Sequence, residues 1–182
     1  MLFRSIGKSL VETDKVNLAK AALEKAKTRR AKFLLPSDDI VATPVNTGKF
    51  DKKGKPIIEF QNHRVHGQPN LPDDASGVDI GPKTIKTYCE MIPAARTIVW
   101  NGPMGVFEDP RFAEGTFAVA RAVVEATQKN GAKSIIGGGD SVKALNLTGL
   151  TDRVTFVSTG GGASLEFLEG LELPGVAALS NK

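Results

Sequence analysis

Residues 134–141, Ser-Ile-Ile-Gly-Gly-Gly-Asp-Ser, pass from a β-branched run through a glycine triplet into a stretch with helical spacing. The same order recurs at residues 154–164, Val-Thr-Phe-Val-Ser-Thr-Gly-Gly-Gly-Ala-Ser. Three successive glycines let the backbone approach a ligand closely, and the unpaired N–H groups at the start of a helix attract an anion. We therefore predict two neighbouring phosphate sites, between which a phosphoryl group can pass.

From Pro82 onward the chain alternates short apolar runs with helical patterns. The runs at residues 97–100, 134–136 and 154–157 predict strands, and helices are predicted from residue 82 to 92, at 116–129, at 141–147 and from 164 to 168. Strands that alternate with helices indicate a parallel sheet with right-handed crossovers, whose ligands lie at the carboxyl ends of the strands. Residues 77–82, residues 101–108 and both glycine triplets are expected at such ends.

The first third of the chain is less regular. Ser9 to Glu12 has the spacing of a capping box, and apolar residues then recur at helical intervals to about Arg29. Residues 32–35 and 40–42 are short apolar runs that predict buried strands. Between residues 46 and 72 the pattern dissolves into Gly, Pro, Asn and charged residues, which indicates an excursion, such as a hairpin, outside the main sheet.

Composition limits the class of protein. A chain of 182 residues with 41% apolar content forms one domain or one lobe of a larger enzyme. Its 24 Lys and Arg residues are scattered without interleaved aromatics, which argues against nucleic-acid binding. The single cysteine, Cys89, excludes an internal disulfide, and no apolar run reaches the length of a membrane span. These two features predict a soluble, cytoplasmic protein, and residues 1–4 are too short an apolar segment for a secretory signal.

Each glycine triplet has a functional and a structural interpretation. Asp140 follows the first triplet where a carboxylate can hold the Mg²⁺ of a nucleotide, and Ser141 follows where a hydroxyl and an amide can meet a phosphate. Neither triplet fits the Walker sequence or the spaced-glycine dinucleotide fingerprint. A tight strand-to-helix turn with Asp140 as an ordinary N-cap is therefore the alternative.

The segment 101–108, Asn-Gly-Pro-Met-Gly-Val-Phe-Glu, suits a ligand that is half apolar and half hydroxylated. A base stacked on Val106 and a ribose held by Glu108 would satisfy that pattern. The alternative is a loop whose Phe107 only fills the core. The two histidines lie in the irregular region without Cys or His partners, so we expect no zinc site.

Four long motifs together resemble phosphoglycerate kinase, in that family's order: Asp-Ile-Gly-Pro-Lys-Thr at 79–84, Trp-Asn-Gly-Pro-Met-Gly-Val-Phe-Glu at 100–108, Gly-Gly-Gly-Asp-Ser at 137–141 and Ser-Thr-Gly-Gly-Gly-Ala-Ser-Leu-Glu at 158–166. The resemblance runs from about Ile6 to Lys182. It implies an α/β fold, a Rossmann-like three-layer parallel sheet with helices on both faces, incomplete at its amino-terminal end. Residues 1–182 would form a partial nucleotide-binding domain with an irregular excursion at about 46–72.

The resemblance also implies a reaction and its residues. The family transfers a phosphoryl group reversibly between 1,3-bisphosphoglycerate and MgADP, giving 3-phosphoglycerate and MgATP in glycolysis and gluconeogenesis. Matching positions assign Gly77 and Val78 to the adenine and Glu108 to the ribose hydroxyls. The remaining positions are Asn101, Gly138, Gly139, Asp140 and Ser141 at the phosphates, with Asp140 also at the Mg²⁺, and Gly160, Gly161 and Gly162 at the phosphoryl group in flight.

Parts of the family's pattern have no counterpart in this sequence. These are the amino-terminal lobe, whose Arg and His patch holds 3-phosphoglycerate, and the Gly-Gly-Ala-Lys segment with the strand that follows it. We therefore expect negligible turnover by the chain alone, and binding of 3-phosphoglycerate or 1,3-bisphosphoglycerate only with the missing lobe. Three alternatives stay open: a kinase that is truncated or completed by another polypeptide, a noncatalytic ADP/ATP-binding module, and a fragment that self-associates through its incomplete sheet.

Overall fold

A computed structural model describes residues 5–67, 70–158 and 160–179 of the chain. Contacts divide it into two compact units, Met1–Thr84 and Ile85–Lys182. The first unit contains the sheet β2-β1-β3 and the second the sheet β4-β5-β6. The segment 1–4, which the sequence excluded as a secretory signal, and Thr159 of the second glycine motif lie outside the described residues.

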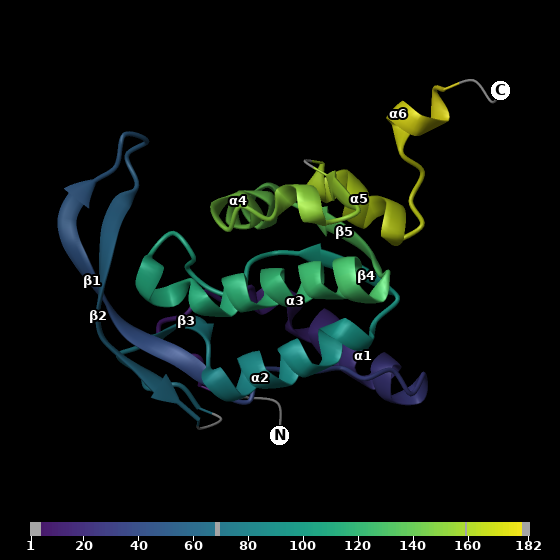
Figure 1. Cartoon of the computed structure of the whole chain (residues 1–182). Coiled ribbons are helices and arrows are strands. Elements are labelled where there is room, and N and C mark those ends of the chain that lie inside the picture. The colour runs from purple at the N-terminus through teal and green to yellow at the C-terminus, as the bar shows by residue number, and fades with distance from the viewer. Residues whose placement is uncertain (1–4, 68–69, 159, 180–182) are drawn as a thin grey trace. The chain divides into compact units, whose positions relative to one another are not determined.

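The elements follow one another along the chain as strands and helices (Figure 1). The first unit contains η1 (Thr13–Lys15), α1 (Val16–Thr28), β1 (Asp39–Phe50), β2 (Pro56–His66), β3 (Ser76–Ile80) and the start of α2 (Pro82–Met91). The second contains η2 (Ile92–Ala94), β4 (Thr97–Asn101), η3 (Pro110–Phe112), α3 (Glu114–Asn130), β5 (Lys133–Gly137), α4 (Gly139–Leu147), η4 (Thr151–Arg153), β6 (Phe156–Ser158), α5 (Gly161–Leu168) and α6 (Pro174–Ala177).

The irregular stretch of the first unit contains most of a long β-hairpin. Strands β1 and β2 pair antiparallel and form the long curved ribbon of Figure 1. At its turn the Asp51 carboxylate accepts hydrogen bonds from the N–H groups of Lys53 and Lys55, each at 2.8 Å. The predicted buried strand at residues 40–42 is confirmed, and this strand, β1, pairs antiparallel with both β2 and β3.

Two other predictions for the first unit are wrong. Ser9 caps no helix, since α1 begins at Val16 after the η1 turn, and the Ser9 hydroxyl accepts a hydrogen bond from the Gly77 N–H at 3.0 Å. Residues 32–35 form no strand, and Phe33, for example, is 52% exposed. An apolar run supplies side chains for a core but not the neighbouring strand that a β-ladder requires.

Asp38 holds the start of α2. One oxygen of its buried carboxylate accepts hydrogen bonds from the Thr84 N–H (2.8 Å) and hydroxyl (2.7 Å), and the other accepts from the Lys83 N–H at 3.0 Å. Burial raises the pKa of Asp38, but these hydrogen bonds and the Lys83 charge outweigh it and lower the pKa below its ordinary value. The ionised carboxylate therefore satisfies helix N–H groups that have no acceptor within the helix.

Replacing Asp38 with Asn should reduce the free energy of unfolding by about 1–3 kcal/mol, because buried N–H donors lose a charged acceptor. The folded pKa lies below the unfolded value of about 3.9, so the carboxylate stabilises the fold above that pH and ceases to as the pH falls through the folded pKa. Urea unfolding of both proteins at neutral and acid pH tests this: the difference should shrink in acid. Asp51→Asn, at the exposed hairpin turn, is the matched control and should cost less.

The second unit is built around a parallel sheet, as predicted. Strand β5 lies between β4 and β6 and pairs parallel with both. Trp100 and Ile136 on one face pack with Val123 of α3 and Leu145 of α4 in a single core cluster. Residues of α5 line a cavity over the opposite face, so helices flank the sheet on both sides.

The helix ends of the second unit agree with the sequence in part. Helix α3 ends where Asn130-Gly131 predicted, with Gly131 in the left-handed conformation at φ 67°. Helices α4 and α5 begin at Gly139 and Gly161, two and three residues earlier than predicted. The glycines thus form the first turns of the helices themselves.

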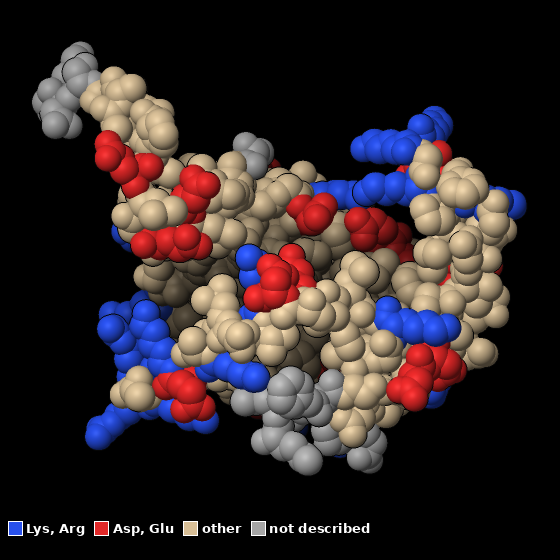
Figure 2. Space-filling model, turned by 180° about the vertical axis from the view of Figure 1, so that it is seen from behind, with Lys and Arg blue, Asp and Glu red and all other residues tan. Residues whose placement is uncertain are grey.

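Within the described part of the chain, no helix is long and apolar enough to cross a membrane. On the face drawn in Figure 2, blue Lys and Arg side chains lie in several separate groups with red Asp and Glu side chains among them. The distribution agrees with the scattered charges of the sequence.

Candidate functional site

Three loops leave the same edge of the parallel sheet. The strand register pairs Asn101 with Gly137 and Gly137 with Ser158, and these are the last residues of β4, β5 and β6. The segment after Asn101 and the two glycine triplets therefore begin side by side. Their prediction at the carboxyl ends of parallel strands is confirmed.

The two glycine triplets touch each other. A Cβ atom on Gly161 would lie 2.6 Å from Cα of Gly138 and 3.0 Å from its nitrogen. A Cβ atom on Gly138 would in turn lie 2.5 Å from the Asn101 carboxamide oxygen. Gly139 and Gly162, in contrast, face open space with no atom within 4 Å of the Cβ position. The close packing of the loops therefore requires glycine at positions 138 and 161. Gly139 and Gly162 have open space beside them, which leaves room for a ligand.

The first turns of α4 and α5 present backbone donors at this edge. The first hydrogen bond of α4 runs from the Val142 N–H to the Gly138 carbonyl, and that of α5 from the Ser164 N–H to the Gly160 carbonyl. The N–H groups of residues 139–141 and 161–163 precede these bonds and have no intrahelical acceptor. Together with the helix dipoles, they make this edge attractive to anions.

Asp140 lies in the first turn of α4 and is exposed. Its interpretation as an N-cap is wrong, because the N-cap is Gly138, whose positive φ of 88° suits glycine, and no side chain caps the helix. The Asp140 carboxylate therefore lies at the N-terminal end of α4 and does not cap the helix. Mg²⁺ is commonly held by one or two carboxylates together with substrate phosphates, and a single exposed carboxylate beside anion-binding N–H groups fits that pattern.

Ser141 has an internal partner that the sequence did not show. Its side chain is fully buried, and its hydroxyl oxygen accepts a hydrogen bond from the Gly102 N–H at 2.6 Å. The Gly102 carbonyl accepts a further bond from the Trp100 indole at 2.7 Å. The Ser141 hydroxyl thus ties α4 to the loop after β4. The backbone N–H of Ser141 is one of the N–H groups at the start of α4 that have no acceptor within the helix.

The structure confirms that Phe107 of the segment 101–108 fills the core, while ligand binding by this segment stays a prediction. Phe107 is buried beside Ala113 and Ala144, and the loop is anchored further by a 3.0 Å hydrogen bond from the Met104 N–H to the Thr116 hydroxyl. Glu108, the next residue, is half exposed. The buried ring fixes the loop, and the fixed loop presents the carboxylate.

Lys143 of α4 is a residue of this region that the sequence analysis missed. Its Nζ lies 3.1 Å from Oε1 of Glu108 and 5.2 Å from the centre of the Phe107 ring. Its position three residues after Asp140, on the same helix, was the signal available in the sequence.

Gly77 and Val78 belong to the first unit. Both lie inside β3 and not after a strand, so their predicted position at a strand's carboxyl end is wrong. Val78 is buried, whereas Gly77 is exposed. The remaining predicted site residues all lie in the second unit, and their contact with a ligand stays a prediction.

Other reactive groups do not form a competing site among the described residues. No cluster of three or more His, Cys, Asp or Glu side chains there can hold a metal ion. Burial raises the pKa of the Cys89 thiol. The Arg121 charge lowers this pKa and the Glu114 charge raises it, each by less than burial does. A thiol with a raised pKa is a weak nucleophile, which agrees with a packing role.

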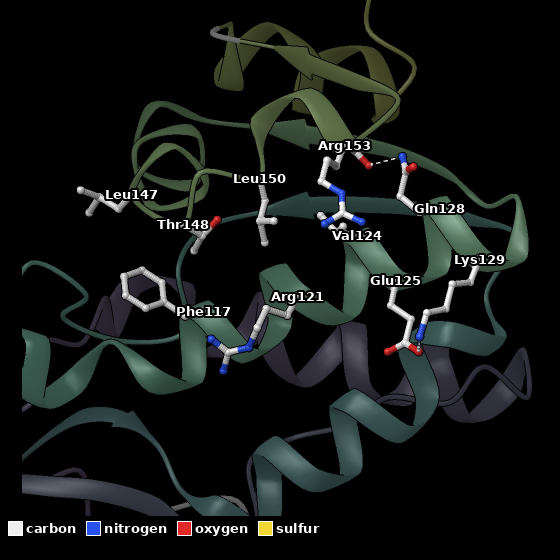
Figure 3. A pocket seen from close by; sticks show the side chains of 10 residues that line it. All are labelled: Phe117, Arg121, Val124, Glu125, Gln128, Lys129, Leu147, Thr148, Leu150 and Arg153. Atoms are coloured by element: carbon white, nitrogen blue, oxygen red, sulfur yellow. Dashed lines mark hydrogen bonds and ion pairs between the residues drawn. The ribbon is translucent and has the colours of Figure 1, made fainter.

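Cavities of the second unit include one beside the glycine loops and one beside α3. One of about 540 Å³ adjoins the glycine loops and is lined by Asn101, Gly161 and apolar side chains such as Val99 and Phe156. The other, of about 450 Å³, lies between α3 and residues 147–153 (Figure 3). It contains none of the predicted site residues. On its rim, Lys129 forms an ion pair with Glu125 at 2.9 Å. Figure 3 shows these two side chains.

Comparison with known proteins relates residues 3–171 to the family model described as phosphoglycerate kinase. Among curated relatives, "Phosphoglycerate kinase" of Chloroherpeton thalassium is 55% identical over 177 residues, covering 97% of this chain and 41% of the relative. The Clostridium kluyveri protein of the same name is 52% identical over 178 residues, with 98% and 41% coverage. The chain thus spans about 41% of the length of the relatives it matches.

Solved structures give the same result. The chain is similar to phosphoglycerate kinase from Coxiella burnetii with a TM-score of 0.79 and 41% identity, over 96% of this chain and 41% of that one. For phosphoglycerate kinase from Pyrococcus horikoshii the TM-score is 0.68 and the identity 34%, over 97% and 40% of the two chains.

Proposed function

Because the chain belongs to the phosphoglycerate kinase family, we propose that it supplies the nucleotide site for phosphoryl transfer between MgADP and 1,3-bisphosphoglycerate, as in glycolysis and gluconeogenesis. The observation that carries the proposal is the contact of Gly138 with Gly161, which sets two helix N-termini side by side. One helix end would bind the nucleotide phosphates and the other the phosphoryl group in flight.

The predicted residues of the second unit each have a role in binding and transfer. Glu108 would bind the ribose hydroxyls, and the half-buried Val106 would contact the base. The N–H groups of residues 138–141 and the Asn101 carboxamide would bind the phosphates. The N–H groups at Gly160–Gly162 would stabilise the transferring group. Phosphoryl transfer requires mainly positioning and charge neutralisation, and rigid backbone donors supply both.

The metal of the proposed site is Mg²⁺, which the exposed Asp140 carboxylate would hold together with the nucleotide phosphates. When bound, Mg²⁺ neutralises charge on the phosphate oxygens. The protein's own part is to present one carboxylate beside the α4 N–H groups.

The proposal places 3-phosphoglycerate and 1,3-bisphosphoglycerate on a part of the enzyme without a counterpart in this chain. The relatives extend well beyond the matched region. We further propose that the chain acts in the cytoplasm and binds neither nucleic acid nor membranes. Its exposed apolar sheet face, which includes Val99 and Phe156, favours association with another polypeptide.

Calorimetric titration with MgADP tests the nucleotide site. The wild-type chain should bind, and Asp140→Ala should weaken binding by about 10-fold or more, because a charged partner of the metal is lost. With ADP and a chelator in place of Mg²⁺, the difference between the two proteins should disappear.

The matched control is Asp152→Ala, which removes the same charge from an exposed position in η4. It should bind MgADP like the wild-type chain. A folded wild-type chain that does not bind MgADP would refute the proposal, and equal losses in both variants would show that only net charge matters.

A further inference from the structure

The pair formed by Lys143 and Glu108 joins two elements of the candidate site. Glu108 lies in the loop between β4 and η3, and Lys143 lies on α4, one turn beyond Asp140. The Nζ–Oε1 distance is 3.1 Å, and the two side chains are 54% and 50% exposed. Ion pairs this exposed contribute only about 0–1 kcal/mol to stability. The Lys143–Glu108 pair therefore contributes little to the stability of the fold.

A second contact fixes the position of the lysine. Its ammonium lies 5.2 Å from the centre of the Phe107 ring, which is within the range of a cation–π interaction. Phe107 is only 3% exposed and is packed in the core, so the ring is a rigid support. Because the Phe107 ring holds the Lys143 ammonium in place, the ammonium restricts the rotation of the Glu108 carboxylate that it binds.

We propose that Lys143 is a positioning residue that orients Glu108 toward the ribose of a nucleoside diphosphate. Binding of one carboxylate oxygen by Lys143 fixes the plane of the carboxylate, and so the direction of the other oxygen. A preoriented carboxylate loses less side-chain freedom when it accepts hydrogen bonds from ribose hydroxyls. Lys143 thereby determines discrimination for the ribose, an inference that rests on the nucleotide site proposed above.

The test compares ADP with 2′,3′-dideoxy-ADP, both with Mg²⁺, by calorimetry on the full chain. The wild-type chain should bind ADP about 10-fold or more tightly, because a carboxylate recognises the ribose hydroxyls. Lys143→Met keeps the apolar stem but removes the charge, and should lower this preference by about two- to fivefold. Lys143→Arg should retain most of it. Adding Lys143→Met to Glu108→Gln should cause no further loss of preference.

The matched control is Lys129→Met, which breaks a comparable exposed ion pair with Glu125 on α3, away from the site (Figure 3). It should leave the preference for ADP unchanged. A wild-type preference for ADP that persists in Lys143→Met would overturn the role of Lys143 and leave the nucleotide site intact. Failure of the wild-type chain to bind MgADP would refute the proposed function itself, and with it this inference.

Discussion

Gly161→Ala should separate the two glycine loops and abolish most MgADP binding. The added Cβ would lie 2.6 Å from Cα and 3.0 Å from the nitrogen of Gly138, and these two Gly138 atoms belong to backbone that cannot rotate away as a side chain does. The loops must therefore move apart by several tenths of an ångström, and this movement displaces the first turn of α4. A misplacement of about 1 Å costs catalytic sites up to about 10²-fold in rate, and we expect a large loss of MgADP affinity from the same displacement of the phosphate-binding N–H groups. Overpacking of this kind also destabilises by about 1–3 kcal/mol.

Two glycine variants separate this effect from a general cost of alanine. Gly162→Ala adds a Cβ with no atom within 4 Å, so its free energy of unfolding should stay within about 0.5 kcal/mol of the wild-type value. Gly175→Ala in α6 also has open space and lies outside the site, so it should keep both stability and MgADP affinity. Calorimetry and urea unfolding of the three variants measure both quantities. Wild-type affinity in Gly161→Ala would contradict the assignment of this contact to the nucleotide site.

The second unit could be predicted well from the sequence because its pattern is local. Apolar runs at residues 97–100 and 134–136 lie in strands β4 and β5, and Gly131 ends α3 as expected. A parallel sheet then follows from alternation alone. The resemblance to phosphoglycerate kinase added the family, which comparison with known proteins confirms.

The first unit was harder because its structure depends on distant partners. Asp38 binds groups 45 and 46 residues away, and Ser9 accepts a bond from Gly77 across 68 residues. Neither partner is visible in a local pattern, so the capping box at Ser9 misled. An antiparallel partner likewise decided the direction of the sheet that contains residues 40–42.

Within the site, the important residues could be predicted from the sequence, but the contacts that require these residues could not. Glycines were expected to leave space for a ligand, yet Gly161 leaves space for the backbone of Gly138, and Gly138 leaves space for the Asn101 carboxamide. Ser141 was expected to meet a phosphate through its hydroxyl and its amide, and the sequence did not show that the hydroxyl accepts a hydrogen bond from the Gly102 N–H. These contacts join loops that meet only at the sheet edge, so they required the fold.

Turnover should require a second polypeptide. The chain alone is expected to catalyse phosphoryl transfer at a rate at least about 10³-fold below that of a mixture with the remaining part of a relative, such as the Chloroherpeton thalassium enzyme. The physical reason is that loss of the acceptor site removes the positioning of the two substrates. A coupled assay with the chain, the added part and their mixture measures this. Asp140→Ala in the chain should abolish the gain, which shows that the chain supplies the nucleotide site.

The exposed apolar sheet face makes this prediction specific. Phe156 is 59% exposed beside the cavity that adjoins the glycine loops, and Phe156→Ser should weaken association by removing apolar area from the interface. Leu147→Ser is the matched control, because Leu147 is 60% exposed but lines the cavity beside α3. Turnover of the mixture should therefore require higher concentrations of the Phe156 variant and not of the Leu147 variant. Full turnover by the chain alone would show that its own residues complete the site. A stable but inactive mixture would leave nucleotide binding as the activity of this chain.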